Sequence, residues 1–572
     1  MAVPVWSVDP RTGEQRERVA AEATPEAVDG AVRAAHAARE ALADRAVRAA
    51  LLRAAAARLA EAEAELVAAA DAETALGAAR LSGELARTTG QLRAFAEVVD
   101  EGAFLDVVID HADPGHTPPR PDLRRCKLPL GVVAVYAASN FPLAFSVPGG
   151  DTASALAAGC PVVIKAHPGH PATSELAARL LRRAAVDAGL PPEVIGLVHG
   201  FQAGLELVRH PLVAAAGFTG SVRGGRALYD AAAARPRPIP FHGELGSLNP
   251  VVVTPAAAEE RAEEIGAGLA ASMTLGNGQF CTKPGLVLAP AGTAGDRLLA
   301  SLAKAVGAVA AGVLLDARMR ESFVAGVGER TRLPDVQAPV LPGDGGGLAV
   351  RPGFLTVPAA RLAADGPHDL LLEECFGPVT VVARYTERAE LSAVLGRLAG
   401  NLTATVHLGD MEGAEPGGAG VSGEEAGGHA GGHDHGGYGD RDGYGGQGGQ
   451  GDRGGQGGQG GQGGRGGRGE YGERGGYGAR LLAELTPLAG RVVVNGWPTG
   501  VAVSHAQHHG GPYPATTSTA TSVGATAVER WLRPVVYQDA PAALLPPELR
   551  EENPLGLPRR VDGVLRAAPG AR

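Results

Sequence analysis

Hydrophobic and polar positions follow different periods along this chain, and the changes of period mark its organisation. Between residues 20 and 100, apolar residues recur at helical spacing, as at Leu52, Leu59 and Leu66. This spacing predicts long amphipathic helices. Residues 102–127 then carry four prolines, which is typical of a loop or an edge hairpin.

A first alternation of short apolar runs and helical patterns begins at Gly131. Buried strands are predicted at 131–136, 161–165, 195–199 and 213–218, and helices over 149–159, over 174–188 (capped by Thr173 or Ser174) and after Gly220. Strand–helix–strand order predicts parallel βαβ units with right-handed crossovers. Because the strands are continuously apolar, we expect helices on both faces of the sheet.

A second alternation follows and predicts a second α/β unit. Its strands are expected at 251–253, 285–288, 379–382, 402–408 and 491–494, and its helices over 256–275, near 295–312 and from Arg480. The fold class is therefore α/β, with two open parallel sheets.

A glycine-rich tract over residues 411–478 interrupts this second unit. It holds 33 of the 85 glycines, in Gly-Gly-Gln and Arg-Gly-Gly repeats. Such a segment has too little apolar content to form a core, so it predicts a disordered insertion within one domain. Arg-Gly-Gly repeats with interspersed tyrosines also suggest RNA binding, but the tract contains 10 acidic and only 5 basic residues.

Charge and cysteine content narrow the class of protein. The formal net charge is −10 and there are four cysteines. Without a basic excess, we expect neither nucleic acid nor a membrane surface as the main partner. Few cysteines, a charged N-terminus and the lack of a long apolar run predict a cytoplasmic protein.

Cys281 carries the strongest local signal. It lies in Gly276-Asn-Gly-Gln-Phe-Cys-Thr, at the end of a helical pattern, where backbone can approach a substrate closely. A nucleophilic role requires a site that favours thiolate. A small buried residue is the alternative interpretation of any single cysteine.

Two further residues carry candidate chemistry. Glu244 precedes an apolar strand. Burying a carboxylate there costs free energy unless the residue is functional or paired. Burial is also expected to raise the pKa of Glu244 towards neutrality, which suits a base. Asn140 follows a buried strand, at the edge where open parallel sheets bind ligands. Its amide is suited to donate to a developing oxyanion.

Taken together, these segments resemble the aldehyde dehydrogenase superfamily. The matching motifs, in the order of that family, are Asn140-Phe-Pro, Val162-Val-Ile-Lys165, Phe218-Thr-Gly-Ser221, Glu244-Leu-Gly, Gly278-Gln-Phe-Cys281, Glu374-Cys-Phe376-Gly-Pro and Asn495-Gly-Trp-Pro-Thr-Gly500. Segments around Ala137, Lys165 and His509 are similar to a branch of bacterial NADP-preferring members, the 2,5-dioxovalerate (α-ketoglutaric semialdehyde) dehydrogenases.

The resemblance implies two Rossmann-like domains: an NAD(P)-binding domain at 1–245 and a catalytic domain at 246–530. It further implies an oligomerisation hairpin at 109–127. This hairpin pairs with strands near 531–538, within a C-terminal segment at 531–572 that forms an oligomerisation strand and a tail. A homodimer or homotetramer is expected.

The resemblance also assigns roles to individual residues. Cys281 attacks the aldehyde to give a thiohemiacetal and then a thioester, Asn140 holds the oxyanion, and Glu244 activates the water that releases the carboxylate. The implied cofactor-binding residues are Lys165, Gly220, Ser221, Gly225, Glu374 and Phe376.

One departure from the family bears on the cofactor. Many NAD-preferring members carry Glu three residues after the strand lysine, where this chain has Pro168. Loss of that carboxylate admits a 2′-phosphate, so we expect NADP in preference to NAD, with Arg223 as a candidate charge. His505, His508 and His509 are interpreted as a loop near the substrate entrance rather than a metal site.

The sequence leaves the substrate open. A semialdehyde such as 2,5-dioxovalerate needs a cation for its distal carboxylate, and no spacing selects one arginine. The alternatives are a broad-specificity dehydrogenase of medium or long-chain aldehydes, a CoA-acylating dehydrogenase, and a non-catalytic scaffold or RNA-binding protein that acts through the glycine-rich tract.

Overall fold

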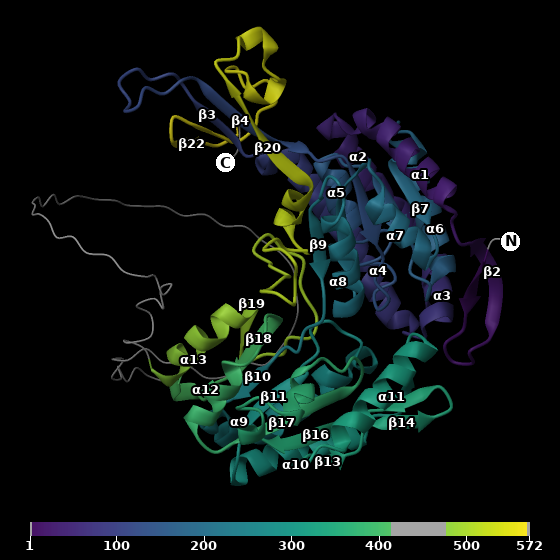
Figure 1. The fold of residues 1–572 in the computed structure, drawn as a ribbon, viewed down its shortest axis with the longest axis vertical. Coiled ribbons are helices and arrows are strands. Elements are labelled where there is room, and N and C mark those ends of the chain that lie inside the picture. Colours follow the sequence, from purple (N-terminus) through teal and green to yellow (C-terminus); the bar gives the residue numbers. More distant parts are fainter. Residues whose placement is uncertain (1–2, 413–475, 569–572) are drawn as a thin grey trace, which may run out of the picture.

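The computed structural model describes residues 3–412 and 476–568, which form two α/β lobes and a projecting sheet (Figure 1). The expected disordered tract lies mainly outside the described residues. Its first residues, 411 and 412, belong to η7 (Asp410–Glu412), and its last two begin α13 (Tyr477–Leu485). These two flanks approach each other closely, since a Cβ on Gly478 would lie 2.5 Å from the Glu412 carbonyl oxygen.

The first lobe is built on a parallel sheet with the strand order β7-β6-β5-β8-β9. Its strands are β5 (Val132–Tyr136), β6 (Val162–Lys165), β7 (Ile195–Val198), β8 (Val213–Thr219) and β9 (Phe241–Glu244). Val133 and Val135 pack into one core, and Val132 and Ala134 into another on the opposite face. The prediction of a sheet covered on both faces is therefore confirmed.

Helices of the N-terminal half form these two cores. They are α1 (Pro25–Ala38), α2 (Arg45–Glu61), α3 (Glu63–Thr74), α4 (Ala78–Glu101), α5 (Gly150–Ala158), α6 (Pro171–Asp187), α7 (Phe201–Arg209) and α8 (Val222–Ala233). The predicted N-cap of α6 is wrong, because the helix begins at Pro171. The Glu73 carboxylate accepts from the backbone N–H groups of Ala172 and Thr173, so a neighbouring helix supplies the cap.

The second lobe contains a sheet of seven strands within the described residues, in the order β13-β16-β17-β11-β10-β18-β19. The strands are β10 (Val251–Val253), β11 (Leu286–Pro290), β13 (Gln337–Val340), β16 (Gly353–Pro358), β17 (Val379–Tyr385), β18 (Asn401–His407) and β19 (Ala489–Val494). The helices around it are α9 (Pro255–Thr274), α10 (Thr293–Gly307), α11 (Ala317–Thr331) and α12 (Arg388–Leu395), with α13. Only the edge strand β13 runs antiparallel to its neighbour among the described pairs.

Two small sheets complete the lobes. A hairpin of β1 (Pro4–Val8) and β2 (Gln15–Ala21) begins the described chain, and β12 (Gly312–Val313), β14 (Gly343–Gly346) and β15 (Ala349–Arg351) lie beside α11. The sequence pattern did not predict these strands, nor β9, β13, β16 and α11.

A mixed sheet projects from the first lobe at the upper left of Figure 1, in the order β20-β4-β3-β21-β22. β20 (Leu532–Gln538) runs antiparallel to β4 (Leu123–Pro129), from Leu532 opposite Pro129 to Gln538 opposite Leu123. Its other strands are β3 (Val107–Asp110), β21 (Arg559–Val561) and β22 (Val564–Arg566). Of the helices that the structure describes, none combines the length and apolar character needed to cross a bilayer.

Candidate active site

The carboxyl ends of the first sheet bring several of the expected site residues to one edge. Asn140 lies in the loop after β5, Lys165 ends β6, Gly220 follows β8, and Glu244 ends β9. Parallel strands of an open sheet present these ends to a common crevice. Glu244 thus ends a strand that the sequence pattern did not predict, and the strand expected after it is β10.

The loop that carries Cys281 comes from the second lobe, between η4 (Leu275–Gly278) and β11. Gly278 has φ +68°, and a Cβ there would lie 2.4 Å from the Gly377 backbone, so only glycine fits this close approach. The Asn249 side chain donates to the carbonyls of Cys281 (2.8 Å) and Lys283 (3.0 Å). The nucleophile loop is therefore held in place on both sides of Cys281.

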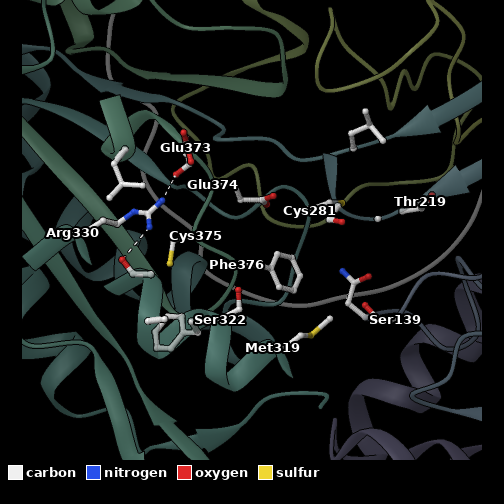
Figure 2. Close-up of a pocket in the computed structure, with 18 of the residues that line it drawn as sticks. Ser139, Thr219, Cys281, Met319, Ser322, Arg330, Glu373, Glu374, Cys375 and Phe376 are labelled. Atoms are coloured by element: carbon white, nitrogen blue, oxygen red, sulfur yellow. Dashed lines mark hydrogen bonds between the residues drawn. The ribbon is translucent and has the colours of Figure 1, made fainter. Parts of the chain in front are cut away.

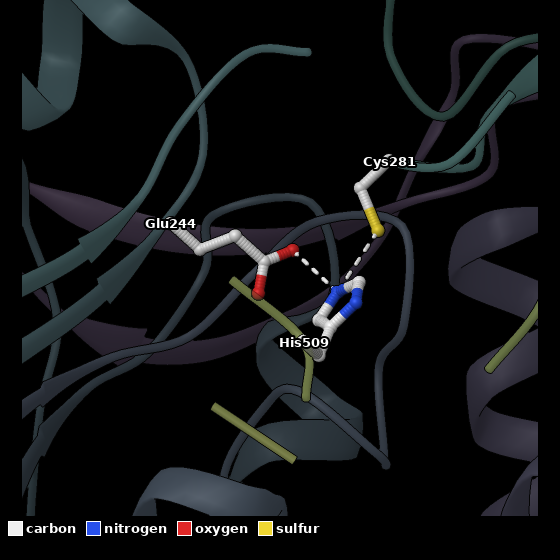
Figure 3. Close-up of side chains that lie close together, drawn as sticks. All are labelled: Glu244, Cys281 and His509. Atoms are coloured by element: carbon white, nitrogen blue, oxygen red, sulfur yellow. Dashed lines mark hydrogen bonds and ion pairs between the residues drawn. The ribbon is translucent and has the colours of Figure 1, made fainter. Parts of the chain in front are cut away.

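Cys281, Glu244 and His509 form a compact group between the two lobes (Figure 3). His509 Nε2 lies 3.0 Å from Glu244 Oε1 and 3.6 Å from Cys281 Sγ, and one ligating atom from each residue lies within 4.8 Å of the others. Ser522 Oγ donates to the other carboxylate oxygen of Glu244 at 2.8 Å. One imidazole nitrogen therefore stands between the sulfur and the carboxylate.

The pKa of Glu244 is lowered, which corrects the sequence expectation of a raised value. Burial raises this pKa, but the charge and hydrogen bond of His509 and the hydrogen bonds of Ser522 and Cys281 together lower it more. A buried carboxylate with two hydrogen-bonded oxygens is held in its ionised form. The Glu244 carboxylate therefore stays ionised below neutral pH.

The thiol of Cys281 also departs from the expectation of a thiolate-favouring site. Burial and the neighbouring Glu244 charge raise the pKa of Cys281 well above its usual value. The sulfur is thus a thiol in the resting protein, and nucleophilic attack requires an adjacent group to take its proton.

Asn140 lies beside this group, with its side-chain Nδ2 donating to the Gln279 carbonyl at 3.0 Å. Gln279 is in turn fixed, because its side-chain oxygen accepts from the Leu315 backbone N–H at 3.0 Å. The amide of Asn140 has a second N–H, and the residue lines the same cavity as Cys281. The amide is therefore oriented by the nucleophile loop itself.

A cavity of about 510 Å³ opens on one side of Cys281. Figure 2 shows Glu374 and Phe376 to one side of Cys281, and Thr219 and Ser139 to the other. Gly220 and Ser221 also line it, and Ser221 caps α8 by accepting from the Gly224 N–H at 3.2 Å. A helix N-terminus at the wall of a polar cavity favours an anionic group such as a pyrophosphate.

Lys283 anchors the chain segment that carries Glu374. Burial raises the pKa of Glu374 to about 7. Lys283, two residues beyond Cys281, donates from Nζ to the carbonyls of Cys375 (3.2 Å) and Val379 (2.6 Å). The segment containing Glu374 is thereby tied to the nucleophile loop.

Two of the expected cofactor residues do not line this cavity. Gly225 lies within α8, where a Cβ would come 2.1 Å from the Leu245 side chain, so its role in the fold is close packing. Lys165 lies at the end of β6, with Nζ 4.9 Å from the centre of the Phe201 ring. Arg318 of α11 approaches the same ring at 5.4 Å, whereas Arg223, the charge considered from sequence, is exposed.

A second cavity, of about 200 Å³, is also lined by Cys281. Its walls come from α4 and from the loops around Phe141, Phe280 and Gly500. Cys281 therefore lines both cavities.

His509 is the residue that sequence reasoning misplaced. The structure buries it (1% exposed) against Glu244, whereas we expected a loop near the substrate entrance. His505 of the same segment is exposed. The motif His509-Gly-Gly-Pro was a signal, but its histidine meets Glu244 and Cys281 only through the tertiary fold.

Comparisons with known proteins agree with this geometry. The aldehyde dehydrogenase family model matches residues 4–416. The chain is 42% identical over 527 residues to alpha-ketoglutaric semialdehyde dehydrogenase 2 of Azospirillum brasilense, covering 91% of this chain and 87% of that relative. It is 38% identical over 501 residues to alpha-ketoglutaric semialdehyde dehydrogenase of Acinetobacter baylyi, covering 86% and 82%.

A solved structure gives the same fold. Aldehyde dehydrogenase 21 of Physcomitrella patens, in complex with the reaction product succinate, superposes with a TM-score of 0.71 at 17% identity, over 95% of this chain and 96% of that one. The chain therefore belongs to the aldehyde dehydrogenase family and is an NAD(P)-dependent oxidoreductase of aldehydes.

Proposed function

We propose that the protein oxidises 2,5-dioxovalerate or a closely related semialdehyde to the carboxylate, with Cys281 as nucleophile, Glu244 as base and NADP as the preferred cofactor. The observation that carries this proposal is the position of the Cys281 sulfur. It lies 3.6 Å from His509 Nε2, which is hydrogen-bonded to Glu244, and Cys281 lines two cavities.

The resting thiol must lose its proton before it attacks. The ionised carboxylate beside Sγ is that of Glu244, and His509 Nε2, 3.6 Å from Sγ, donates to its Oε1 at 3.0 Å. In our proposal the Glu244 carboxylate takes the thiol proton as Sγ bonds to the aldehyde carbon, which gives the thiohemiacetal, and it releases that proton to water before thioester hydrolysis.

Charge then develops on the former carbonyl oxygen. The second N–H of the Asn140 amide and the Cys281 backbone N–H are the donors that we assign to this oxyanion. One such donor typically contributes about 3 kcal/mol to transition-state stabilisation. NAD(P)⁺ supplies the hydride acceptor when it is bound, and the sulfur is left as a thioester.

Release of the product requires a water molecule activated next to the thioester. Glu244 is buried, its pKa is lowered, and one of its oxygens lies within reach of the sulfur. An ionised carboxylate at this point acts as the general base for thioester hydrolysis. Ser522 fixes the other oxygen, so the carboxylate keeps its orientation.

The large cavity fits a dinucleotide. Glycine and serine at the start of α8 suit the pyrophosphate, and Glu374 beside Phe376 suits the nicotinamide ribose. Lys165 and Arg318 flank one exposed aromatic ring, and burial together with the Arg318 charge lowers the pKa of Lys165 to about 8. Two neighbouring cations with Pro168 in place of an acid favour the 2′-phosphate of NADP.

We further propose a homodimer or homotetramer, formed through the projecting sheet, in the reducing environment of the cytoplasm. β20 and β22 leave Val536, Val564 and Leu565 exposed by 52%, 62% and 69%. All four cysteines are free thiols, and the proposed reaction depends on one of them. Light scattering of the purified protein measures the oligomeric state.

A spectrophotometric screen tests the proposed function. The purified protein is assayed for NADPH and NADH formation with 2,5-dioxovalerate, succinic semialdehyde, pentanal, octanal and decanal. We expect the highest kcat/KM for 2,5-dioxovalerate with NADP. Preference for octanal or decanal supports the broad-specificity alternative instead, and a CoA-dependent product supports the acylating one.

A further inference from the structure

The small cavity on the second side of Cys281 is lined by both aromatic and cationic side chains. Phe141, Phe145 and Phe280 form its apolar walls, and Arg80 and Arg87 enter it from α4. The two arginines are seven residues apart, which is two helical turns, so they lie on the same face of α4. Two cations therefore share a space of about 200 Å³ with the nucleophile.

Aromatic rings hold both guanidinium groups in place. The Arg80 guanidinium carbon lies 4.9 Å from the Phe141 ring centre and 5.3 Å from that of Phe280. Arg87 lies 5.0 Å from the centre of Phe145. Cation–π contact fixes an arginine without satisfying its N–H donors, because the ring face offers no lone pair.

Several of those donors lack partners. Arg87 Nε and Nη2 are buried and have no hydrogen-bond partner in the part of the chain that the structure describes, and the same holds for Arg80 Nη1. Two other buried arginines of the first lobe have acceptors for their donors, although Arg48 Nε also lacks one. Arg235 donates to the carbonyls of Val208 and His210, and Arg530 to the Asp151 carboxylate at 2.7 Å. Buried donors of a charged group are costly to leave without an acceptor.

The one acid that lines this cavity does not neutralise both arginines. Glu84 Oε1 accepts from the backbone N–H groups of Leu143 and Ala144, at 2.8 and 2.9 Å. Its Oε2 is 3.9 Å from Arg80 Nη2, which is an ion-pair contact beyond hydrogen-bond length. Burial raises the pKa of Glu84, which further reduces the negative charge in the cavity.

We propose that Arg87, assisted by Arg80, binds the distal carboxylate of the substrate, and so selects short aldehydes that carry an acid at the far end. The aldehyde carbon then lies at Cys281 and the short carbon chain lies between the phenylalanine rings. A carboxylate supplies the acceptors that the Arg87 Nε and Nη2 donors lack, in the fork geometry that arginine prefers. This inference rests on the proposed semialdehyde oxidation and names the residues that give it its specificity.

The test is the ratio of kcat/KM for 5-oxopentanoate to that for pentanal, which has the same chain length and no charge. In the Arg87→Gln variant we expect this ratio to fall about 10- to 100-fold, mainly through a higher KM for the acid substrate. Arg87→Lys keeps the charge without the fork, and an intermediate ratio is expected. Arg93→Gln is the matched control, because Arg93 is an exposed arginine of the same helix, and its ratio should equal that of the wild type.

The outcomes separate this inference from the proposed function. If Arg87→Gln lowers kcat/KM for both aldehydes by the same factor, Arg87 is structural and the inference is wrong, while semialdehyde oxidation stands. If the wild type shows no preference for the acid substrate and oxidises long-chain aldehydes, the proposed substrate class is wrong. Thermal melting of each variant shows whether a loss for both substrates comes from unfolding.

Discussion

The two cavities that meet at Cys281 differ in size and charge. The larger, of about 510 Å³, is lined by both lobes and contains Glu244, Glu373 and Glu374 together with the N-terminal end of α8. The smaller, of about 200 Å³, contains two arginines between aromatic rings. The first suits a large polar cofactor with ribose hydroxyls and phosphates, and the second suits a small acid.

This difference suggests that the cofactor and the substrate bind in different cavities next to the Cys281 sulfur. In our proposal, cofactor and substrate approach the sulfur from different cavities, so each has its own recognition groups. Glu244 lines the larger cavity, and the Glu244–His509 pair contacts the sulfur, so in our proposal it takes part in the chemistry of every substrate. Substitutions in this pair are therefore expected to affect every substrate, and substitutions within one cavity to affect one ligand.

The largest effect is expected for Cys281→Ala, because it removes the atom that the two cavities share. Steady-state oxidation should fall by at least about 10⁴-fold, since no acyl intermediate forms. NADPH absorbance measures the loss, and quenching of protein fluorescence by NADP should still report cofactor binding. Cys126→Ala, at a buried thiol of β4, is the control. Turnover at the wild-type rate in Cys281→Ala rejects the mechanism.

Glu244→Gln should slow the reaction by about 10²- to 10⁴-fold, because it removes the base that activates water. Its first turnover should still appear as a burst of NADPH, followed by slow release of the thioester. Stopped-flow absorbance gives the burst amplitude per active site. A variant that hydrolyses the thioester at the normal rate shows that another residue is the base.

His509→Asn should lower kcat by about 10²-fold at neutral pH and change its pH dependence. Burial raises the pKa of Glu244 and His509 lowers it. Loss of the histidine should therefore raise the pKa of Glu244. Because the base acts in its ionised form, the acid limb of the kcat–pH profile should move to higher pH. Activity measured from pH 5 to 9 reports this shift, with exposed His505→Asn as control. An unchanged acid limb contradicts the assigned contact.

The smallest effect is expected in the cofactor region alone. Arg318→Gln should raise the KM for NADP about 10-fold and leave the KM for NAD nearly unchanged, because only NADP carries the 2′-phosphate. Arg223→Gln, at an exposed arginine of α8, should change neither value. Equal KM changes for both cofactors indicate that Arg318 affects the fold of α11 and not the phosphate.

The apolar runs predicted the central strands of both sheets well, because continuous burial leaves an unambiguous sequence signal. β5 and β6 appear within one residue of their expected bounds. β9 was missed, because Phe241-His-Gly-Glu alternates over only four residues. α6 begins three residues before the expected start, because its cap comes from Glu73, nearly 100 residues earlier in the chain.

Local motifs identified Asn140, Glu244 and Cys281 as candidates, because a strand end or a glycine-flanked loop leaves a mark in the sequence. They did not identify the contacts of His509, since its motif does not show which side chains it meets, nor Arg87, since nothing adjacent distinguishes it from a solvated side chain. The signs of the pKa shifts were also inaccessible. The value for Glu244 depends on a histidine 265 residues away, and the value for Cys281 depends on how fully the lobes bury it.

The sequence by itself determined the family, the apolar central strands of the two lobes, and the residue types available for catalysis. The tertiary structure alone decided which of these side chains meet, which charges remain without partners, and on which side of the sulfur each cavity opens. The physical reason is that backbone periodicity and turn chemistry are local, whereas burial and electrostatic coupling depend on distances between residues far apart in the chain.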